Sequence, residues 1–282
     1  MAAGKCRLRT ASGKKDEKMK KKRKKQQRRL EKKLLLLLIV LGLLGGCYTY
    51  FVDPEFPGKF AAAVDNCTEG LEGFVDSLTG GGDESAISLE DIPEYSGEPY
   101  VVVEGNEPDF SGEERKEESF EEYSELDRLG RCQEACANVG VDLMPTEERG
   151  SISEVKPSGW ENEYYDFVDG GYVYNRCHLI GYQLAGENAN EKNLITGTRY
   201  MNVEGMLPFE NQVAEYVRDT GNHVLLRVTP IYDGTNLVAS GVQMEAESVE
   251  DNGMSVRFNV YCYNVQPGVE IDYATGENWM EE

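Results

Sequence analysis

The sequence predicts an α+β domain, with a central antiparallel sheet flanked by helices, that follows a single transmembrane helix near the N-terminus. The last part of the chain contains several runs typical of strands, joined by short turns. A segment with apolar residues at helical spacing precedes these runs, and a wholly apolar segment lies close to the N-terminus. At 282 residues the chain is long enough for one large domain or two small ones.

The formal net charge of −22 is distributed unevenly along the chain. Residues 1–33 contain 16 Lys and Arg against 3 Asp and Glu, which leaves 13 basic and 48 acidic residues, a net charge of −35, for residues 34–282. Such an acidic region is a poor candidate for nucleic-acid binding, because phosphate contacts dominate that affinity. Screening beyond roughly 8 Å still allows a local group of arginines and a cation to attract phosphate. Any nucleic-acid binding is therefore expected to be weak and to depend on metal.

The N-terminal residues predict a membrane anchor. Residues 1–33 form a basic cytoplasmic tail, and residues 34–52 are nineteen uncharged residues that would reach roughly 28 Å as a helix, close to the hydrocarbon thickness. The basic residues before this run and the acidic ones after it predict a cytoplasmic N-terminus at the cell membrane and an extracellular domain. A cleavable signal peptide and a lipoprotein site at Cys47 are alternatives, and the long basic segment argues against both. Residues 53–96 predict an acidic flexible stalk before a packed domain at 97–282.

The first half of this domain predicts one helix and few strands. Ser111 and Glu114 fit a capping box and predict a helix that runs to about Leu126. The mixture of apolar and small residues from Leu129 to Met144 predicts one or two strands. Pro157 to Trp160 predicts a turn that buries Trp160 in the core, with stacking of Trp160 on a nucleic-acid base as the alternative.

The second half predicts more regular elements. Tyr172 to Tyr174 predicts a short strand that leads into Asn175–His178, and a polar loop follows from Gly186 to Asn193. Apolar residues at helical spacing predict a helix from Pro208 to Asp219, ended by Gly221. Strands are predicted at Val224–Thr229 and Leu237–Glu247 and, half-buried, at Val256–Tyr263, with turns at Asp233–Gly234 and Asp251–Gly253.

Seven cysteines leave the redox state open. Cys132 and Cys136 are four residues apart, but no second Cys or His pair completes a zinc site. One or two disulfides are expected in an extracytoplasmic domain, with the pairing undetermined among Cys67, Cys132, Cys136, Cys177 and Cys262.

The two histidines differ in their surroundings. His178 stands beside Arg176 at the end of a predicted strand, where a neutral imidazole could act as a general base near neutral pH. The amide oxygen of Asn202 could hold a hard cation. His223 opens a strand without partners in the pattern, and we interpret it as structural.

The order Asn175-Arg176-Cys177-His178, then Glu191 to Thr196, then Asn202 and Glu210 resembles the DNA/RNA non-specific endonucleases. This is the ββα-metal, or His-Me finger, group with the signature Asp-Arg-Gly-His. The chain is most similar to the membrane-associated DNA-entry nucleases of bacteria, over roughly residues 97–282. It departs from the signature twice, with Asn175 in place of Asp and Cys177 in place of Gly.

The resemblance implies a ββα-metal motif and an endonuclease that hydrolyses DNA or RNA without sequence preference. It implies that His178 is the general base and that Asn202 binds Mg²⁺, with Mn²⁺ as an alternative. Glu210 would hold a water bound to the metal. Arg176 would clamp the scissile phosphate or brace the site, and Asn193 would fix the loop or contact the substrate.

Several alternatives stay open. Arg199 and Arg227 are weaker phosphate candidates, Asn175 could lower the activity, and Cys177 could form a disulfide. A surface module that binds nucleic acid without cutting it, or a secreted toxin, would share the same fold. The resemblance to DNA-entry nucleases implies a role in DNA uptake, and scavenging or defence fits the sequence equally well.

Overall fold

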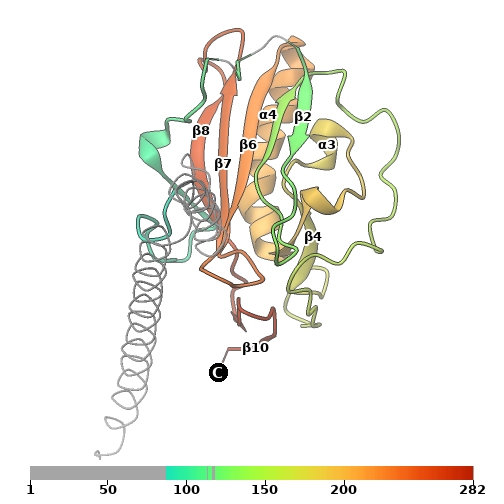
Figure 1. Ribbon diagram of the computed structural model, residues 1–282, viewed down its shortest axis with the longest axis vertical. Helices are drawn as coiled ribbons and strands as arrows, with labels where there is room; N and C mark the ends of the chain where they lie inside the picture. The colour runs from blue at the N-terminus through green and yellow to red at the C-terminus, as the bar shows by residue number, and fades with distance from the viewer. Residues whose placement is uncertain (1–86, 113, 116–117, 282) are drawn as a thin grey trace, which may run out of the picture. The chain divides into compact units, whose positions relative to one another are not determined.

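The computed structural model describes residues 87–112, 114, 115 and 118–281 (Figure 1). The predicted basic tail, transmembrane helix and most of the predicted stalk lie outside these residues. Within the described part of the chain, no helix is long and apolar enough to cross a membrane. Residues 87–96, predicted as stalk, pack on the domain, since Ile87 is buried and its N–H donates to the Gln243 side chain at 2.8 Å. The packed part therefore begins before residue 97.

A six-stranded sheet forms the centre of the domain, and every pair of neighbouring strands is antiparallel. Three of the strands follow one another in sequence and lie side by side as β6, β7 and β8 (Figure 1). The predicted antiparallel sheet is confirmed. In spatial order the strands are β1 (Tyr100–Val102), β8 (Arg257–Tyr263), β7 (Gly241–Ser248), β6 (Val224–Ile231), β3 (Ala135–Val139) and β2 (Phe120–Tyr123).

A separate hairpin and the helices contribute the residues predicted to form the site. The hairpin consists of β4 (Tyr174–His178) and β5 (Leu194–Thr198), paired antiparallel. Helix α3 (Tyr182–Ala185) and a 3₁₀ turn (Glu191–Asn193) lie in the connection between the two strands. After β5, a π-helix (Met201–Met206) leads directly into α4 (Leu207–Thr220), so the helix predicted at 208–219 is confirmed. The remaining elements are a 3₁₀ turn (Glu104–Asn106) and a small hairpin of β9 (Val269–Ile271) and β10 (Asn278–Met280).

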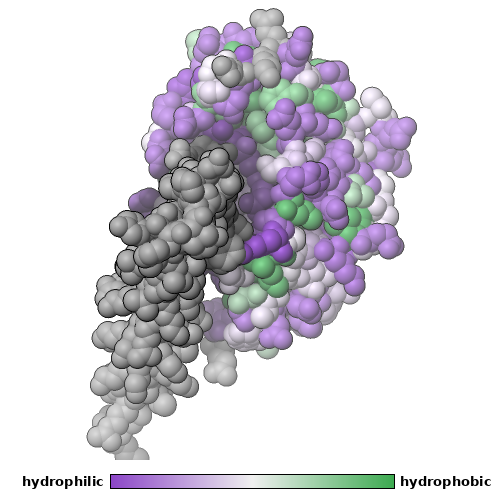
Figure 2. Space-filling model, in the orientation of Figure 1, coloured by the Kyte–Doolittle hydropathy of each residue, from purple (hydrophilic) through white to green (hydrophobic). Residues whose placement is uncertain are grey.

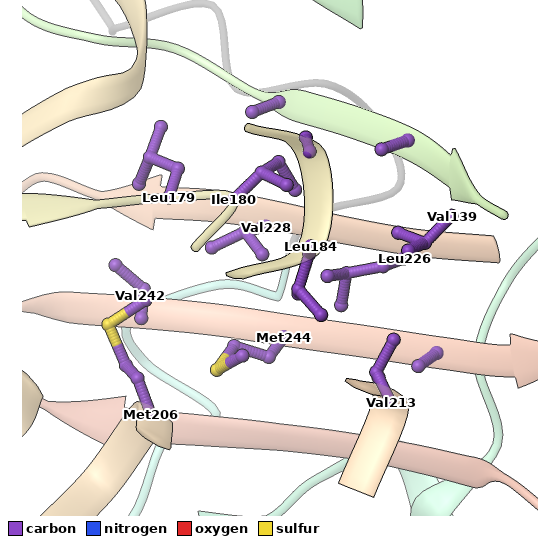
Figure 3. Close-up of a cluster of buried hydrophobic side chains, with 14 of the residues drawn as sticks. Val139, Leu179, Ile180, Leu184, Met206, Val213, Leu226, Val228, Val242 and Met244 are labelled. Carbon is purple, nitrogen blue, oxygen red and sulfur yellow. The ribbon is translucent and has the colours of Figure 1, made fainter. Parts of the chain in front are cut away.

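The main core lies between these helices and one face of the sheet. Figure 3 shows Leu184 of α3 and Val213 of α4 in one cluster with side chains of β6 and β7, and Met206 lies beside Val242. Alternate residues of the strands reach this cluster because successive side chains of a strand point to opposite faces. Figure 2 shows the consequence on the visible surface, where hydrophilic side chains predominate and hydrophobic ones form small separate patches.

The opposite face of the sheet is also covered, by two smaller hydrophobic clusters and by a layer of polar groups. The Arg227 guanidinium donates to Glu245 at 3.0 Å and to Glu114 at 3.2 Å, and Arg115 pairs with Glu247 at 3.1 Å. Because of this second layer, six of the seven residues of β8 are buried. The prediction of a half-buried strand at 256–263 is therefore wrong.

Two local predictions differ from the structure. No helix occurs among the described residues between 111 and 126, although the Ser111 N–H donates to Glu114 at 2.6 Å as in half of a capping box. The other carboxylate oxygen of Glu114 binds Arg227, so a tertiary contact outweighs the local signal. The strand predicted at Tyr172 begins instead at Tyr174 and contains Asn175 to His178, which keeps His178 at its end.

The expected disulfides are not found among the described residues, where all four cysteines are free. Cys132 belongs to the main core, whereas Cys136 belongs to a smaller cluster that includes Leu225. Cys136 lies in β3 and points away from the main core, whereas Cys132 precedes the strand, so the two cysteines reach different clusters. Cys67, the remaining candidate for pairing, lies outside the described residues.

Candidate active site

A cleft of about 930 Å³ brings together most of the predicted site residues. Arg176 and His178 reach it from the same side of β4, while Cys177 between them points into the core. Asn202 reaches it from the π-helix, and Glu210 reaches it from the first turn of α4. Further side chains that line the cleft are Arg149, Trp160, Asp169, Tyr172, Asn175 and Arg199.

His178 is held in a single tautomer by its two neighbours. His178 is buried, with 6% of the residue exposed. Its Nε2 is 2.8 Å from the Asn188 carbonyl oxygen, and its Nδ1 is 3.2 Å from Nη2 of Arg149. A carbonyl only accepts and a guanidinium only donates, so Nε2 carries the proton and Nδ1 carries the lone pair. Burial lowers the pKa of His178 to about 4, and the nearby charge of Arg149 lowers it further against the Asn188 hydrogen bond. At neutral pH the ring is therefore uncharged, and its Nδ1 is free of a proton and can act as a base.

Arg149 was not predicted from the sequence. It is an exposed residue of the long connection from β3 to β4, which is yellow-green in Figure 1 and loops away from the sheet. Its guanidinium is the group that faces Nδ1 of His178. The local sequence Glu-Glu-Arg-Gly gives no signal for a site, because only the tertiary fold brings this loop to β4.

Asn202 lies where the helix is widened to a π-turn, a geometry that often occurs at functional sites. Its Oδ1 is 3.0 Å from Sγ of Cys177, which donates its S–H. Burial raises the pKa of Cys177, so the thiol keeps its proton and acts as a donor. An amide oxygen has two lone pairs, and this contact leaves one of them for another partner.

Glu210 is a buried carboxylate with incomplete charge compensation. The residue is 9% exposed, and its carboxylate lies directly against Gly181, where an added Cβ would be 2.6 Å from Oε2. Burial raises the pKa of Glu210 to about 7, while the Gln183 side chain and the charge of Arg149 act in the opposite direction. The carboxyl group therefore keeps its proton to a higher pH than an exposed glutamate would.

Asn193 lies outside the cleft. Its Oδ1 accepts the Ile180 N–H at 2.8 Å, and its Nδ2 donates to the Ile180 carbonyl at 3.0 Å. Since both ends of the buried amide bind backbone, Asn193 fixes the segment after His178. The alternative, a contact with substrate, disagrees with this geometry.

Arg176 braces the wall of the cleft. It donates to the carbonyl oxygens of Val155 and, at 2.9 Å, of Ser153. Its guanidinium also stacks on the Trp160 ring, 4.3 Å from the centroid. Trp160 is half-buried: it packs against a small core cluster that includes Tyr174, and it also lines the cleft. The prediction that Trp160 lies in the core is therefore confirmed only in part.

The other basic side chains considered from the sequence lie in different parts of the structure. Arg199 lines the cleft and pairs with Asp169 at 2.8 Å. Arg227 lies in the polar layer on the far face of the sheet, so a phosphate contact from Arg227 is excluded. His223 does not line the cleft, and its Nδ1 is 2.7 Å from Oε1 of Glu250. This pairing agrees with the interpretation of His223 as a structural residue.

Comparison with solved structures supports the fold. NucA from Streptococcus agalactiae with magnesium bound is 27% identical, with a TM-score of 0.53 over 58% of this chain and 80% of that chain. NucA without metal is 24% identical, with a TM-score of 0.59 over 74% of this chain and 96% of that chain. The Sda1 nuclease with bound zinc is 24% identical, with a TM-score of 0.52 over 69% of this chain and all of that chain.

The family model that matches residues 112–250 describes DNA/RNA non-specific endonucleases. This range contains β2 to β7 and every residue discussed above as lining the cleft. On this match, residues 112–250 of the chain belong to the DNA/RNA non-specific endonuclease family.

Proposed function

We propose that this protein is a divalent-metal-dependent endonuclease that hydrolyses phosphodiester bonds of DNA or RNA without reading their sequence. The observation that carries the proposal is the neutral, buried His178, whose Nδ1 lone pair lies in the same cleft as Asn202 and Glu210. A base of this kind can take a proton from an attacking water at neutral pH.

The donor groups of the cleft fit a hard cation. Among the described residues, no group of three or more His, Cys, Asp or Glu could hold a metal ion. Asn202 Oδ1, which keeps one lone pair beside its contact with Cys177, would be the direct protein ligand of a cation that keeps several waters, which is the habit of Mg²⁺. The raised pKa of Glu210 indicates a carboxylate that nearby positive charge would stabilise in its ionised form. The magnesium bound in NucA, at 27% identity, supports Mg²⁺, and Mn²⁺ has similar ligand preferences.

When bound, the cation would supply positive charge to the scissile phosphate and to the leaving 3′ oxygen. His178 accepts the proton of the attacking water at Nδ1, while the Nε2–H bond to the Asn188 carbonyl keeps the ring in place and stabilises the imidazolium. Arg149 occupies Nδ1 in the present structure, so it has to move before proton transfer. Its planar fork suits the phosphate that enters beside His178.

Glu210 and Arg176 complete the arrangement without contacting the reacting bond. Ionised Glu210 accepts hydrogen bonds from water in the cleft and so orients the solvent next to Asn202. Arg176 holds the cleft wall through backbone carbonyls and Trp160, which favours the bracing role over the phosphate clamp.

The charge of the cleft is compatible with nucleic-acid binding, although the chain as a whole is strongly acidic. Three arginines line it, Arg149, Arg176 and Arg199, against two acidic groups, Asp169 and Glu210. The cleft thus carries a local excess of positive charge within a strongly acidic chain, and exposed charges beyond roughly 8 Å are screened at physiological salt. Contacts of these arginines with phosphate would carry no sequence information, which supports cleavage without sequence preference.

A plasmid-digestion assay with Mg²⁺ or Mn²⁺, and with EDTA as the metal-free control, tests the proposal. His178→Ala is expected to lower the rate by ~10²- to 10⁴-fold, the usual contribution of a positioned base. Asn202→Ala is expected to raise the metal concentration needed for half-maximal rate. His223→Ala is the matched control, because it removes the other histidine from outside the cleft and should retain the activity.

Activity of His178→Ala close to that of the wild type would refute the assignment of the base. A wild-type protein that binds DNA on a column, yet leaves it intact with both metals, would instead favour the binding module that the sequence left open.

We also propose that the domain acts outside the cell, anchored to the membrane by residues 34–52. The basic residues before this apolar run and the acidic residues after it support that orientation. Protease treatment of intact cells is expected to remove the domain from the membrane fraction, and recovery of a protected, cytosolic protein would contradict the proposal. Measuring uptake of labelled DNA beside growth on DNA as a phosphate source separates uptake from scavenging.

A further inference from the structure

Two tyrosines stand exposed on a short hairpin that leads into β4. Tyr164 and Tyr172 face each other across an antiparallel bridge, and their rings meet edge to face with centroids 5.5 Å apart. Tyr164 is 62% exposed and Tyr172 is 53% exposed. Directly opposed residues of a hairpin point to the same side, so the two rings form one aromatic surface in contact with water.

The hairpin holds these rings in a fixed position. The Tyr165 N–H donates to the Gly171 carbonyl at 2.7 Å, and the Val173 N–H donates to the Glu163 carbonyl at 3.1 Å. Gly171 has a φ of +84°, and a Cβ at this position would overlap the Tyr164 ring. The Tyr164 ring therefore lies over the Gly171 backbone and depends on the absence of a side chain there.

The aromatic pair is continuous with the cleft. Tyr172 lines the same cleft as His178 and stands six residues before it in the chain. Six residues of extended chain reach at most roughly 20 Å, so Tyr172 lies within a few nucleotides of a phosphate bound at His178.

The charges around the pair select which part of a nucleic acid can approach it. Glu161, Glu163, Asp166 and Asp169 lie in the same hairpin segment and repel phosphate. The arginines of the cleft attract phosphate, and the uncharged faces of the tyrosine rings suit the uncharged faces of bases. A bound strand would thus direct its backbone toward the arginines and its bases toward the hairpin.

We propose that Tyr164 and Tyr172 form a base-stacking subsite for unpaired nucleotides, which makes single-stranded nucleic acid the preferred substrate class. This inference rests on the proposed endonuclease function. In a duplex each base face is covered by the next base pair, so the rings have no free face to stack on. In a single strand each base offers a free face whatever its identity, which is compatible with cleavage without sequence preference.

The test measures binding separately from cleavage. Full-length protein with His178→Ala is titrated in Mg²⁺ against a fluorescent oligothymidylate and against a duplex of equal length, with fluorescence anisotropy as the signal. Adding Tyr164→Ala and Tyr172→Ala is expected to weaken binding of the single strand about tenfold or more, since loss of a stacked base has this effect. Duplex binding is expected to change less than twofold.

Two matched variants control for the fold. Tyr164→Phe with Tyr172→Phe keeps both rings and is expected to retain the single-strand affinity. Trp279→Ala removes an aromatic side chain from a residue that is 48% exposed and does not line the cleft, and it is expected to have no effect. Thermal unfolding of each variant shows whether the hairpin is intact.

An equal loss of single-strand and duplex binding, or no loss of either, overturns the stacking subsite. These results differ from a failure of the proposed function, which is measured on protein with His178 intact. A wild-type protein that cuts neither single strands nor duplexes, but still binds single strands through the tyrosines, refutes the nuclease and leaves the subsite in place.

Discussion

Glu210→Gln is expected to make the fold more stable at neutral pH while it lowers the nuclease activity. The carboxyl group of Glu210 is buried, and burial raises its pKa from 4.5 to about 7. A pKa change of this size corresponds to about 3 kcal/mol, since one unit is about 1.4 kcal/mol. Gln has nearly the same shape as the protonated carboxyl group and cannot ionise, so it removes this cost.

The sign of the pH dependence follows from proton counting. Between pH 4.5 and about 7 the folded state keeps the Glu210 proton while the unfolded state has lost it. The free energy of unfolding therefore falls as the pH rises through this window. The difference between Glu210→Gln and wild type is expected to be near zero at pH 4.5 and to grow to about 3 kcal/mol above pH 7.

His178 acts in nearly the same window with the opposite sign. Burial lowers its pKa from 6.5 to about 4, so between these values the unfolded state binds a proton that the folded state does not. The free energy of unfolding rises with pH through this window. In the wild type the contributions of Glu210 and His178 largely cancel between pH 4.5 and 6.5.

Guanidinium unfolding at a series of pH values, followed by tryptophan fluorescence, measures these contributions. EDTA is present throughout, so that no cation compensates the carboxylate. Stability of Glu210→Gln is expected to rise with pH up to about 6.5, and stability of His178→Ala is expected to fall between 4.5 and about 7. A Glu210→Gln variant that differs from wild type by a constant amount at every pH would show that Glu210 is not a desolvated carboxylate.

Three further predictions address other parts of the structure. Arg227→Ala is expected to destabilise the fold by about 3–5 kcal/mol, because it leaves buried carboxylates unpaired. The specific activity of the folded fraction is expected to stay unchanged. A change in the Mg²⁺-dependent rate per folded molecule would instead indicate that Arg227 contacts the substrate. Gly181→Ala is expected to lower the activity at least tenfold with little loss of stability, because the added methyl group would displace the Glu210 carboxylate, and a rate equal to wild type would contradict the close contact. The four described cysteines are expected to resist a thiol reagent at pH 8 in the native protein and to react in guanidinium, because burial raises their pKa values. Mass spectrometry of the labelled peptides measures the reaction, and a cysteine that stays unlabelled in guanidinium would reveal an unexpected disulfide.

The elements that could be predicted are those whose signal is local. Alternating strands joined by turns with Asn and Gly predict the meander of β6, β7 and β8, and helical spacing predicts α4. The capping box at Ser111 was a valid local signal, but Glu114 forms an ion pair with Arg227 from a distant strand. A single sequence does not show that Arg227 competes with the helix cap for the Glu114 carboxylate, so the predicted helix is wrong.

The same distinction applies to the site. His178, Asn202 and Glu210 lie within one contiguous hairpin and helix, so their order along the chain was enough to predict that they meet. Arg149 comes from a connection without regular structure, and no spacing relates it to His178. The sequence also left two roles for Asn193, and only the paired hydrogen bonds with Ile180 distinguish between them.

The departure from the family signature at Cys177 has a structural explanation in the neighbouring strand. Gly197 of β5 lies diagonally across from Cys177, and a Cβ on Gly197 would be 2.6 Å from the Cys177 Cβ. The Cys177 side chain, which replaces the Gly of the family signature, therefore has room because Gly197 of β5 has no side chain. The thiol reaches Asn202 Oδ1 and leaves the ring of His178, on the other side of the strand, untouched. The departure thus bears on the orientation of the proposed cation ligand and not on the base, which favours an active enzyme over a module that only binds.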